Sequence, residues 1–250
     1  MIHIGDKWGH KYDLTIDFLK RFKYFIKTGI FLPYHSEMLD RIYEQFPEFL
    51  PNSNDVVYDI GAQYGDYSII CSKIYGVEKV YAWEPLKQNY KKFDHFIKIN
   101  NIYGFDIESY SFALSDRNES IQIRHNGMLN KSNIGDIEEY IMFRVLDDIS
   151  RMEKSEFPPS ALIKIGVGIK LPTLMKIDVE GYEMKVLMGA LRIIGMARPR
   201  IIIETHTIEL ENEVRAFFKN LNYNEPKEYR RIKNKDGNEF VNLFFMPMEE

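Results

Sequence analysis

Short apolar runs alternate with amphipathic helical stretches along most of this 250-residue chain, and that alternation constrains its fold more than any other feature. The strand-like runs are residues 55–60, 79–85, 105–116, 119–127, 140–148, 174–180 and 198–206, and the helical stretches are residues 67–76, 86–101, 182–195 and 208–222. Runs of this length in this order predict an α/β fold with a mostly parallel sheet, helices on both faces and right-handed crossovers.

The two ends of the chain depart from that alternation. Near the C-terminus, two strand-like runs flank residues 235–238, whose turn sequence KDGN predicts an antiparallel hairpin at the end of the sheet. Near the N-terminus, apolar residues at helical spacing predict helices over residues 13–30 and 36–46. We therefore expect a helical N-terminal cap segment, residues 1–50, followed by an α/β domain, residues 51–250.

Composition and charge limit the classes of partner. A single cysteine, Cys71, excludes an internal disulfide and a zinc site built on several thiolates. The net charge of -4 creates no overall field that would attract nucleic acid, so no nucleic-acid partner is expected. No run approaches the ~18 to 20 apolar residues of a membrane span, and the first residues lack a signal-peptide pattern. These features predict a cytoplasmic protein without a transmembrane segment.

The sequence YDIGAQYG, residues 58–65, ends a strand and opens a helix, which is a ligand-binding position in parallel α/β folds. A dinucleotide-binding turn has the spacing G-x-G-x-x-G, but here only Gly61 and Gly65 are present, and Gln63 replaces the second glycine. Asp59, in front of the turn, would repel a phosphate and favours a cationic or amine-bearing ligand. The turn therefore disfavours a nicotinamide-dependent oxidoreductase.

Glu84 follows about 20 residues beyond the turn, at the end of the next strand, where such folds place a carboxylate that chelates ribose hydroxyls. Together with Asp59 it indicates a nucleoside without phosphates. S-adenosylmethionine has that structure, with adenine, ribose, an amino acid and a sulfonium. The structural alternative is that Asp59 caps the turn and Glu84 is a solvated residue at a strand end.

Six stretches resemble the FkbM-type S-adenosylmethionine-dependent methyltransferases. They are VVYDIGAQYGDYS, VYAWEPLKQNYKKFDHFIKINN, SFALSDRNESIQI, FRVLDDI, LMKIDVEGYEMKVLMGA and RPRIIIETH, and KIDVEG is the most specific of them. The resemblance implies a class I methyltransferase (Rossmann-like) fold with a seven-stranded sheet whose last strand is antiparallel. It also implies S-adenosylmethionine as the cofactor.

The same resemblance assigns cofactor binding to residues at the ends of several strands. They are Asp59, Gly61, Ala62 and Gly65 in the turn, Glu84 and Pro85 after the next strand, Ala113 and Leu114 in a loop expected to contact adenine, and Asp178 in KIDVEG.

Asp178, Glu180, Glu204 and His206 end two neighbouring strands, so we expect them to converge near the cofactor as catalytic residues. His206 is the best candidate base, because an imidazole with a pKa of about 6.5 accepts protons at cellular pH. The carboxylates can orient the acceptor, or Asp178 and Glu204 can hold a hard cation such as Mg²⁺. The alternatives are that Glu180 caps the helix beginning near Tyr182 and that His206 is a structural loop histidine.

These features predict an S-adenosylmethionine-dependent O-methyltransferase that acts on a hydroxyl of a sugar, a glycoconjugate or another small hydroxylated molecule. The alternatives are an NAD-dependent oxidoreductase and a non-catalytic module that binds S-adenosylmethionine or a glycan. Basic residues beside phenylalanines in residues 13–30 could rest on an anionic membrane surface, but this pattern is more typical of a solvated helix face.

The segment before KIDVEG nearly duplicates it. LIKIGVGIK, residues 162–170, has glycines where LMKIDVEG has carboxylates, and it lies in an apparent insertion over residues 151–172. Because Gly166 and Gly168 make a poor central strand, we expect the first copy to be an edge or surface element and the second to be the inner strand.

Overall fold

The computed structural model describes residues 3–5, 11–13, 28–30, 44–100, 107–125, 137–149, 169–232 and 239–249. The helices predicted over residues 13–30 and 36–46, and the first copy of the doubled segment, lie almost entirely outside these residues. The described part of the N-terminal segment includes two short strands, β1 (His3–Gly5) and β2 (Lys11–Asp13), which pair antiparallel, so the segment is not wholly helical as predicted. A short helix, η1 (Pro47–Phe49), precedes the α/β domain.

A seven-stranded sheet with the order β11-β12-β10-β9-β3-β4-β5 forms the centre of the fold. Its strands are β3 (Val56–Ile60), β4 (Lys79–Trp83), β5 (Ile107–Tyr110), β9 (Leu174–Ile177), β10 (Arg200–Thr205), β11 (Lys227–Ile232) and β12 (Glu239–Phe245). β5, β4, β3, β9 and β10 run parallel, whereas β12 runs antiparallel to both β10 and β11. The predicted parallel sheet with an antiparallel C-terminal hairpin is confirmed, and its turn, residues 233–238, lies outside the described residues.

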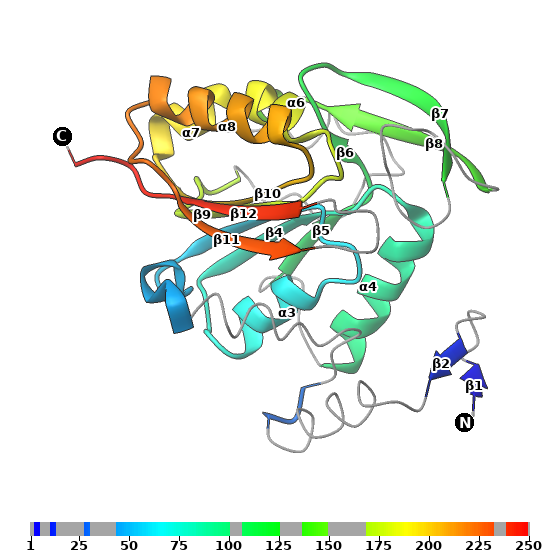
Figure 1. Cartoon of the computed structure of the whole chain (residues 1–250). Helices are drawn as coiled ribbons and strands as arrows, with labels where there is room; N and C mark the ends of the chain where they lie inside the picture. The colour runs from blue at the N-terminus through cyan, green and yellow to red at the C-terminus, as the bar shows by residue number, and fades with distance from the viewer. Residues whose placement is uncertain are drawn as a thin grey trace.

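Helices cover both faces of this sheet (Figure 1). One face carries α3 (Asp66–Lys73) and α4 (Lys87–Ile99), and the other carries α6 (Glu183–Gly189), α7 (Leu191–Ala197) and α8 (Ile208–Asn220). The single helix predicted over residues 182–195 is wrong, because the chain breaks at Ala190. Gly189 has a low helix propensity, and a Cβ there would lie 2.0 Å from the carbonyl oxygen of Ser115, so the end of α6 is packed tightly against that loop.

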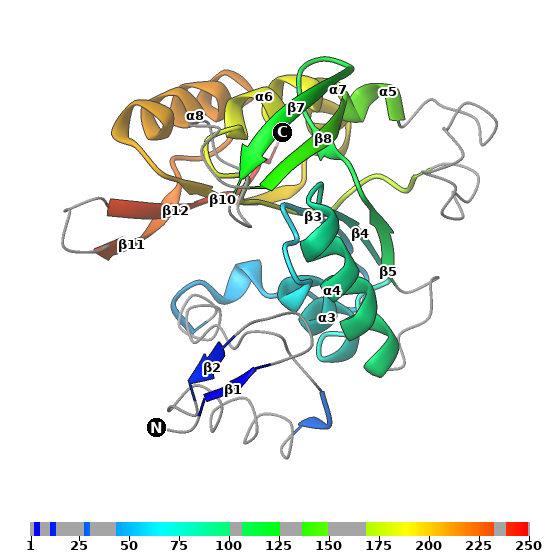
Figure 2. The same cartoon turned by 90° about the vertical axis from the view of Figure 1, so that its right-hand side faces the viewer.

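The middle of the chain forms a second, smaller sheet. Its strands are β6 (Ala113–Leu114), β7 (Glu119–His125) and β8 (Ile137–Arg144), in the order β6-β8-β7, and α5 (Leu146–Ile149) follows them. Figures 1 and 2 both show this sheet beside α6. The exposure of β7 alternates along the strand, whereas β3 is buried throughout. A half-exposed strand cannot lie between two helical layers, which explains why these predicted strands do not join the main sheet.

Alternate residues of each strand point to opposite faces of the main sheet and pack there against the helices. On the face of α6 to α8, the rings of Tyr58, Trp83 and Tyr110 form a row, with centroids 5.1 Å and 5.3 Å apart. On the opposite face, Val57 and Val80 pack under α3 and α4. Because both faces are covered, the parallel strands are apolar nearly throughout, and the polar residues that end them stand out.

Asp55 ties the amino ends of three strands together. Its carboxylate accepts hydrogen bonds from Arg200 Nη2 at 2.5 Å and from Thr173 Oγ1 at 2.6 Å. Arg200 Nη1 also donates to the carbonyl oxygens of Glu48 and Leu50, at 2.7 Å and 3.1 Å. Charge-assisted bonds of this kind hold β3, β9, β10 and η1 in fixed relative positions.

At the other end of β3, the chain passes unusually close to β9. Gly61 has a φ of +83°, and a Cβ there would lie 1.9 Å from the carbonyl oxygen of Asp178. The N–H of Asp178 in turn donates to the carbonyl oxygen of Ile60 at 3.0 Å. Both the left-handed backbone and the close approach require glycine at this position.

Replacing Gly61 with alanine should therefore destabilise the fold. We expect Gly61→Ala to lower the free energy of unfolding by about 2 to 4 kcal/mol, because the methyl group collides with backbone and the positive φ becomes strained. The control is Gly195→Ala in α7, where an added Cβ meets nothing within 4 Å. That variant should gain about 0.5 to 1 kcal/mol from higher helix propensity. Urea unfolding followed by circular dichroism measures both, and a Gly61→Ala variant as stable as the wild type would contradict the close approach.

Candidate active site

The direction of the strand order reverses between β3 and β9, because the chain continues from β3 to β4 and β5 on one side and from β9 to β10 on the other. Open α/β sheets bind ligands at such a point, outside the carboxyl ends of the strands. The predicted site residues Asp59, Glu84, Asp178 and Glu204 lie at this end of β3, β4, β9 and β10 respectively. The candidate active site is therefore at the edge that the sequence predicted.

The glycine turn uses its own N–H groups within the protein. Gly61 and Ala62 both donate to the carbonyl oxygen of Trp83, at 3.0 Å and 2.9 Å. The N–H of Gln63, which has a φ of +50°, donates to Glu84 Oε2 at 3.0 Å. These donors are not available to a phosphate, and the turn differs in this respect from an anion-binding nest.

Glu84 is held at the end of β4 by three donors. Besides Gln63, the N–H of Leu86 donates to Oε1 at 3.0 Å and Asn89 Nδ2 donates to the same oxygen at 3.2 Å. Burial raises the pKa of Glu84 to about 7, although these hydrogen bonds oppose the rise. Each carboxylate oxygen has two lone pairs, so Oε2, which accepts one donor here, can accept a further hydrogen bond from a ligand hydroxyl.

Asp59 and Asp178 share one buried cation. Asp59 is fully buried, its Oδ2 accepts a 2.6 Å hydrogen bond from Ser68 Oγ, and its Oδ1 lies 3.8 Å from Lys176 Nζ. Lys176 Nζ is also 3.5 Å from Asp178 Oδ2. Burial raises the pKa of Asp59, while burial of Lys176 is outweighed by Asp178, Asp59 and Glu204, which raise its pKa. The lysine therefore carries its charge among the carboxylates.

Asp178, Glu204 and His206 converge into one cluster, hereafter the carboxylate–histidine cluster. Each can place one oxygen or nitrogen within 4.8 Å of the others. His206 Nε2 lies 3.9 Å from Asp178 Oδ1, and both ring nitrogens of His206 are buried and have no hydrogen-bond partner among the described residues. Such a cluster can bind a cation, orient a hydroxyl group or accept a proton.

The loop between β9 and α6 adds two more carboxylates. Glu180 has a left-handed φ of +53°, and its Oε2 lies 3.9 Å from His206 Nε2. The N-cap of α6 is Tyr182 and has no side-chain cap hydrogen bond, whereas Glu183 Oε1, in the first turn of α6, accepts the loop N–H groups of Val179 and Gly181 at 3.3 Å and 3.0 Å. Glu183 is fully buried, 3.6 Å from His206 Nε2, and burial raises its pKa to about 7.

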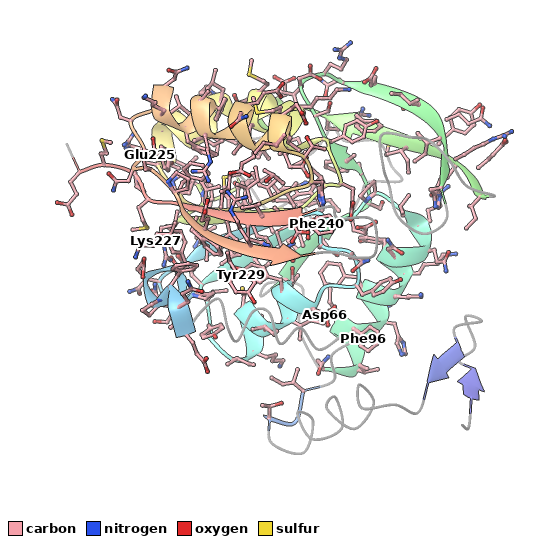
Figure 3. The ribbon with its side chains drawn as sticks, in the orientation of Figure 1. Asp66, Phe96, Glu225, Lys227, Tyr229 and Phe240 are labelled. Carbon is pink, nitrogen blue, oxygen red and sulfur yellow. The ribbon has the colours of Figure 1, made fainter. Side chains whose placement is uncertain are left out.

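The C-terminal hairpin completes the site from β12. Phe240, at the beginning of that strand (Figure 3), places its ring edge-on to the ring of His206, with centroids 4.9 Å apart. Asn242 is opposite Glu204 in the β10–β12 register, and its Nδ2 donates to Glu204 Oε2 at 3.0 Å. The hairpin thus orients Glu204, near the end of β10, and His206, directly after it.

The remaining predicted cofactor residues are buried or half-buried near the glycine turn and the small sheet. Gly65 has a φ of +85° and packs against the ring of Phe93, and Pro85 is half-buried between β4 and α4. The prediction that Ala113 and Leu114 lie in a loop is wrong. They form β6 and pair with residues 143–144 of β8, because those residues offer them a parallel partner.

Sequence reasoning missed Lys176, Glu183 and Asn242. Each was marked by a signal: Lys176 and Asn242 are polar residues inside apolar strands, and Glu183 is an acid in the first turn of a helix. A buried polar residue in a strand requires a partner, so two of the three could have been assigned to a site on that ground.

The comparisons with known proteins concern the family and the fold. The profile of the methyltransferase FkbM domain matches residues 59–225. A solved methyltransferase FkbM from Methylobacillus flagellatus KT is 15% identical with a TM-score of 0.52, and the match covers 80% of this chain but 46% of that one, so this chain spans less than half of its length. No curated protein matches the sequence significantly.

Two further solved structures share the fold. A putative tRNA methyltransferase from Streptococcus pneumoniae is 10% identical with a TM-score of 0.52, over 86% of this chain and 72% of that chain. TrmK from M. capricolum, solved with S-adenosylhomocysteine, is 12% identical with a TM-score of 0.50, over 86% and 70%. At these identities the likeness establishes the class I methyltransferase fold alone.

Among the described helices, none is both long and apolar enough to cross a membrane.

The family profile spans the glycine turn, Glu84, the KIDVEG segment and the ends of β9 and β10, and it covers more than half of the chain. By that match, the chain belongs to the FkbM methyltransferase family.

Proposed function

We propose that this protein transfers the methyl group of S-adenosylmethionine to a hydroxyl oxygen of a sugar, a glycoconjugate or another small hydroxylated molecule. The observation that carries the proposal is the carboxylate-rich end of the sheet, where Asp59, Glu84 and Asp178 lie beside a glycine turn whose N–H groups are bonded within the protein. Such a site suits a cationic nucleoside and disfavours a phosphate. S-adenosylmethionine carries a sulfonium and an ammonium and has no phosphate.

In this proposal the cofactor lies across the turn between β3 and β4. Glu84 accepts the ribose hydroxyls, and Pro85 with Ala113 and Leu114 lies near the adenine. Asp59 lies beneath the glycine turn and contributes its charge from there, since its carboxyl is buried against Ser68 and Lys176. The cofactor product bound to the M. capricolum protein, which shares the fold, supports this choice of ligand.

The acceptor would approach from the carboxylate–histidine cluster. Its oxygen attacks the methyl carbon in line with the sulfur, so an O–C bond forms, and the C–S bond breaks with its electron pair on sulfur. S-adenosylhomocysteine then leaves. Asp178, Glu180 and Glu204 orient the acceptor, and its hydroxyl proton must be removed, either by His206 itself or by a bound cation that lowers the hydroxyl pKa.

A small acceptor is favoured over RNA, although similar structures include tRNA methyltransferases. The chain has a net charge of -4, and the cluster is surrounded by carboxylates that would repel a polyanion. An NAD-dependent oxidoreductase is disfavoured by the same turn that disfavours a phosphate.

Asp178→Asn should impair catalysis much more than cofactor binding. We expect methyl transfer to fall at least about 100-fold, because the carboxylate that orients the acceptor is lost, while the Kd of S-adenosylhomocysteine changes less than about tenfold. Transfer is measured with methyl-labelled cofactor, and binding by calorimetry. The control, Glu209→Gln on the exposed side of α8, should change neither quantity. If the wild type binds the cofactor but labels no acceptor, the protein is a non-catalytic binding module.

Cofactor binding should depend on the ionisation of Glu84. Its pKa of about 7 means that the carboxylate, which accepts a hydrogen bond from the ribose in this proposal, is mostly protonated at pH 6 and mostly ionised at pH 8. The affinity for S-adenosylhomocysteine should therefore rise by up to about tenfold between these pH values and level off above them. Calorimetry across this range measures the rise, and Glu84→Gln should remove it. An equal pH dependence in the variant would show that Glu84 does not bind the ribose.

The acceptor class is tested with a cell extract separated into glycans, lipids, proteins, nucleic acids and small molecules. Incubation with methyl-labelled cofactor should label the glycan or small-molecule fraction, because the cluster is suited to hydroxyl groups. The Asp178→Asn variant provides the background. Label confined to protein or RNA would contradict a sugar or small hydroxylated acceptor.

A further inference from the structure

We infer that Asp178, Glu204 and His206 bind one divalent transition-metal ion. The three candidate ligand atoms lie within 4.8 Å of one another. Two atoms that share one ion at bond lengths of about 2.1 Å are separated by about 3 to 4 Å. His206 Nε2 and Asp178 Oδ1, at 3.9 Å, already have that separation. Glu204, whose nearest ligand atom lies within 4.8 Å of the other two, would complete the set by a shift of about 1 Å.

His206 provides a second, independent observation. Both of its ring nitrogens are buried, and neither has a hydrogen-bond partner among the described residues. Buried imidazoles are normally held by at least one hydrogen bond, because an unpaired buried nitrogen is destabilising. A metal ion bonded to a neutral ring nitrogen satisfies that requirement.

Carboxylates surround the ring of His206. Oxygens of Asp178, Glu180 and Glu183 lie 3.9 Å, 3.9 Å and 3.6 Å from His206 Nε2. Several carboxylate oxygens around one buried ring nitrogen that has no hydrogen-bond partner among the described residues favour a cation at this position.

Lys176 leaves this position open. Its ammonium is shared between Asp59 and Asp178, and it approaches Asp178 through Oδ2. The other oxygen of Asp178, Oδ1, is the one nearest His206. Asp178 can therefore bind the lysine with one oxygen and a metal ion with the other.

The donor set selects the type of ion. One imidazole nitrogen with two carboxylate oxygens suits Mn²⁺, Fe²⁺ or Zn²⁺, whereas Mg²⁺ prefers oxygen ligands alone. The sequence left open a hard cation such as Mg²⁺ on Asp178 and Glu204 as one option, whereas a site with His206 as third ligand favours a transition ion. Three protein ligands leave coordination positions for a substrate.

The role of the ion rests on the proposed function, although its binding does not. An acceptor hydroxyl bound at an open position would have a lowered pKa, so its proton passes to water and the oxygen can attack the methyl carbon. His206 then acts as a metal ligand and not as the base that the sequence predicted.

The site is tested by titrating chelator-treated full-length protein with Mn²⁺ alone, without cofactor or acceptor, and following the electron paramagnetic resonance signal of free Mn²⁺. We expect one bound ion per chain. His206→Ala and Glu204→Gln should each raise the Kd at least about tenfold. The control is His95→Ala on α4, which removes a histidine away from the site and should leave the Kd unchanged.

Pulsed measurements on the wild type make the test independent of whether the variants fold. Bound Mn²⁺ should show coupling to an imidazole nitrogen. Absence of binding at about 1 mM Mn²⁺, binding without nitrogen coupling, or equal binding by folded His206→Ala would each overturn the inference. Methyl transfer is measured separately, with and without chelator. An ion that binds in a protein without transfer activity refutes the proposed function alone, and full activity without ion refutes the role of the metal alone.

Discussion

The shared ammonium of Lys176 is the interaction on which the functional edge of the sheet depends. It lies 3.8 Å from Asp59 and 3.5 Å from Asp178, at the junction of β3 and β9. Asp59 is fully buried, and without a cation it would be protonated or would destabilise the fold by several kcal/mol. With the lysine in place, β3 can present the glycine turn on one side while β9 and β10 present the carboxylate–histidine cluster on the other.

Much of the architecture could be predicted because its determinants are local. The strands of the main sheet are short apolar runs bounded by turn residues, and the hairpin is marked by its turn sequence. The break at Ala190 and the separate sheet of β6, β8 and β7 could not be predicted, because they depend on contacts between distant segments. The approach of Gly189 to Ser115 is one such contact, and nothing in either local sequence indicates it.

The candidate site, too, could be predicted only where its determinants are local in the sequence. Asp59, Glu84 and Asp178 could be identified from sequence, since each is a carboxylate at the end of an apolar strand. The contacts of each could not be predicted: Asp59 is directed inward to Ser68, and Glu183 accepts hydrogen bonds from the loop N–H groups of Val179 and Gly181. Nor could the sequence reveal that Phe240 and Asn242, on the last strand, orient His206 and Glu204.

The bonds of Asp55 have a consequence for how the chain folds. Asp55 contacts Thr173 across 118 positions and Arg200 across 145, so β3 meets its partners only after very long loops have closed. Contacts of such sequence separation form late, because the loop entropy is lost before the strands pair. The cofactor half and the acceptor half of the site are therefore joined by contacts between segments far apart in the sequence, which raise the contact order of the fold. Weakening the bonds of Asp55 would loosen the alignment of both halves at once, although Asp55 lies at the opposite end of β3 from the site.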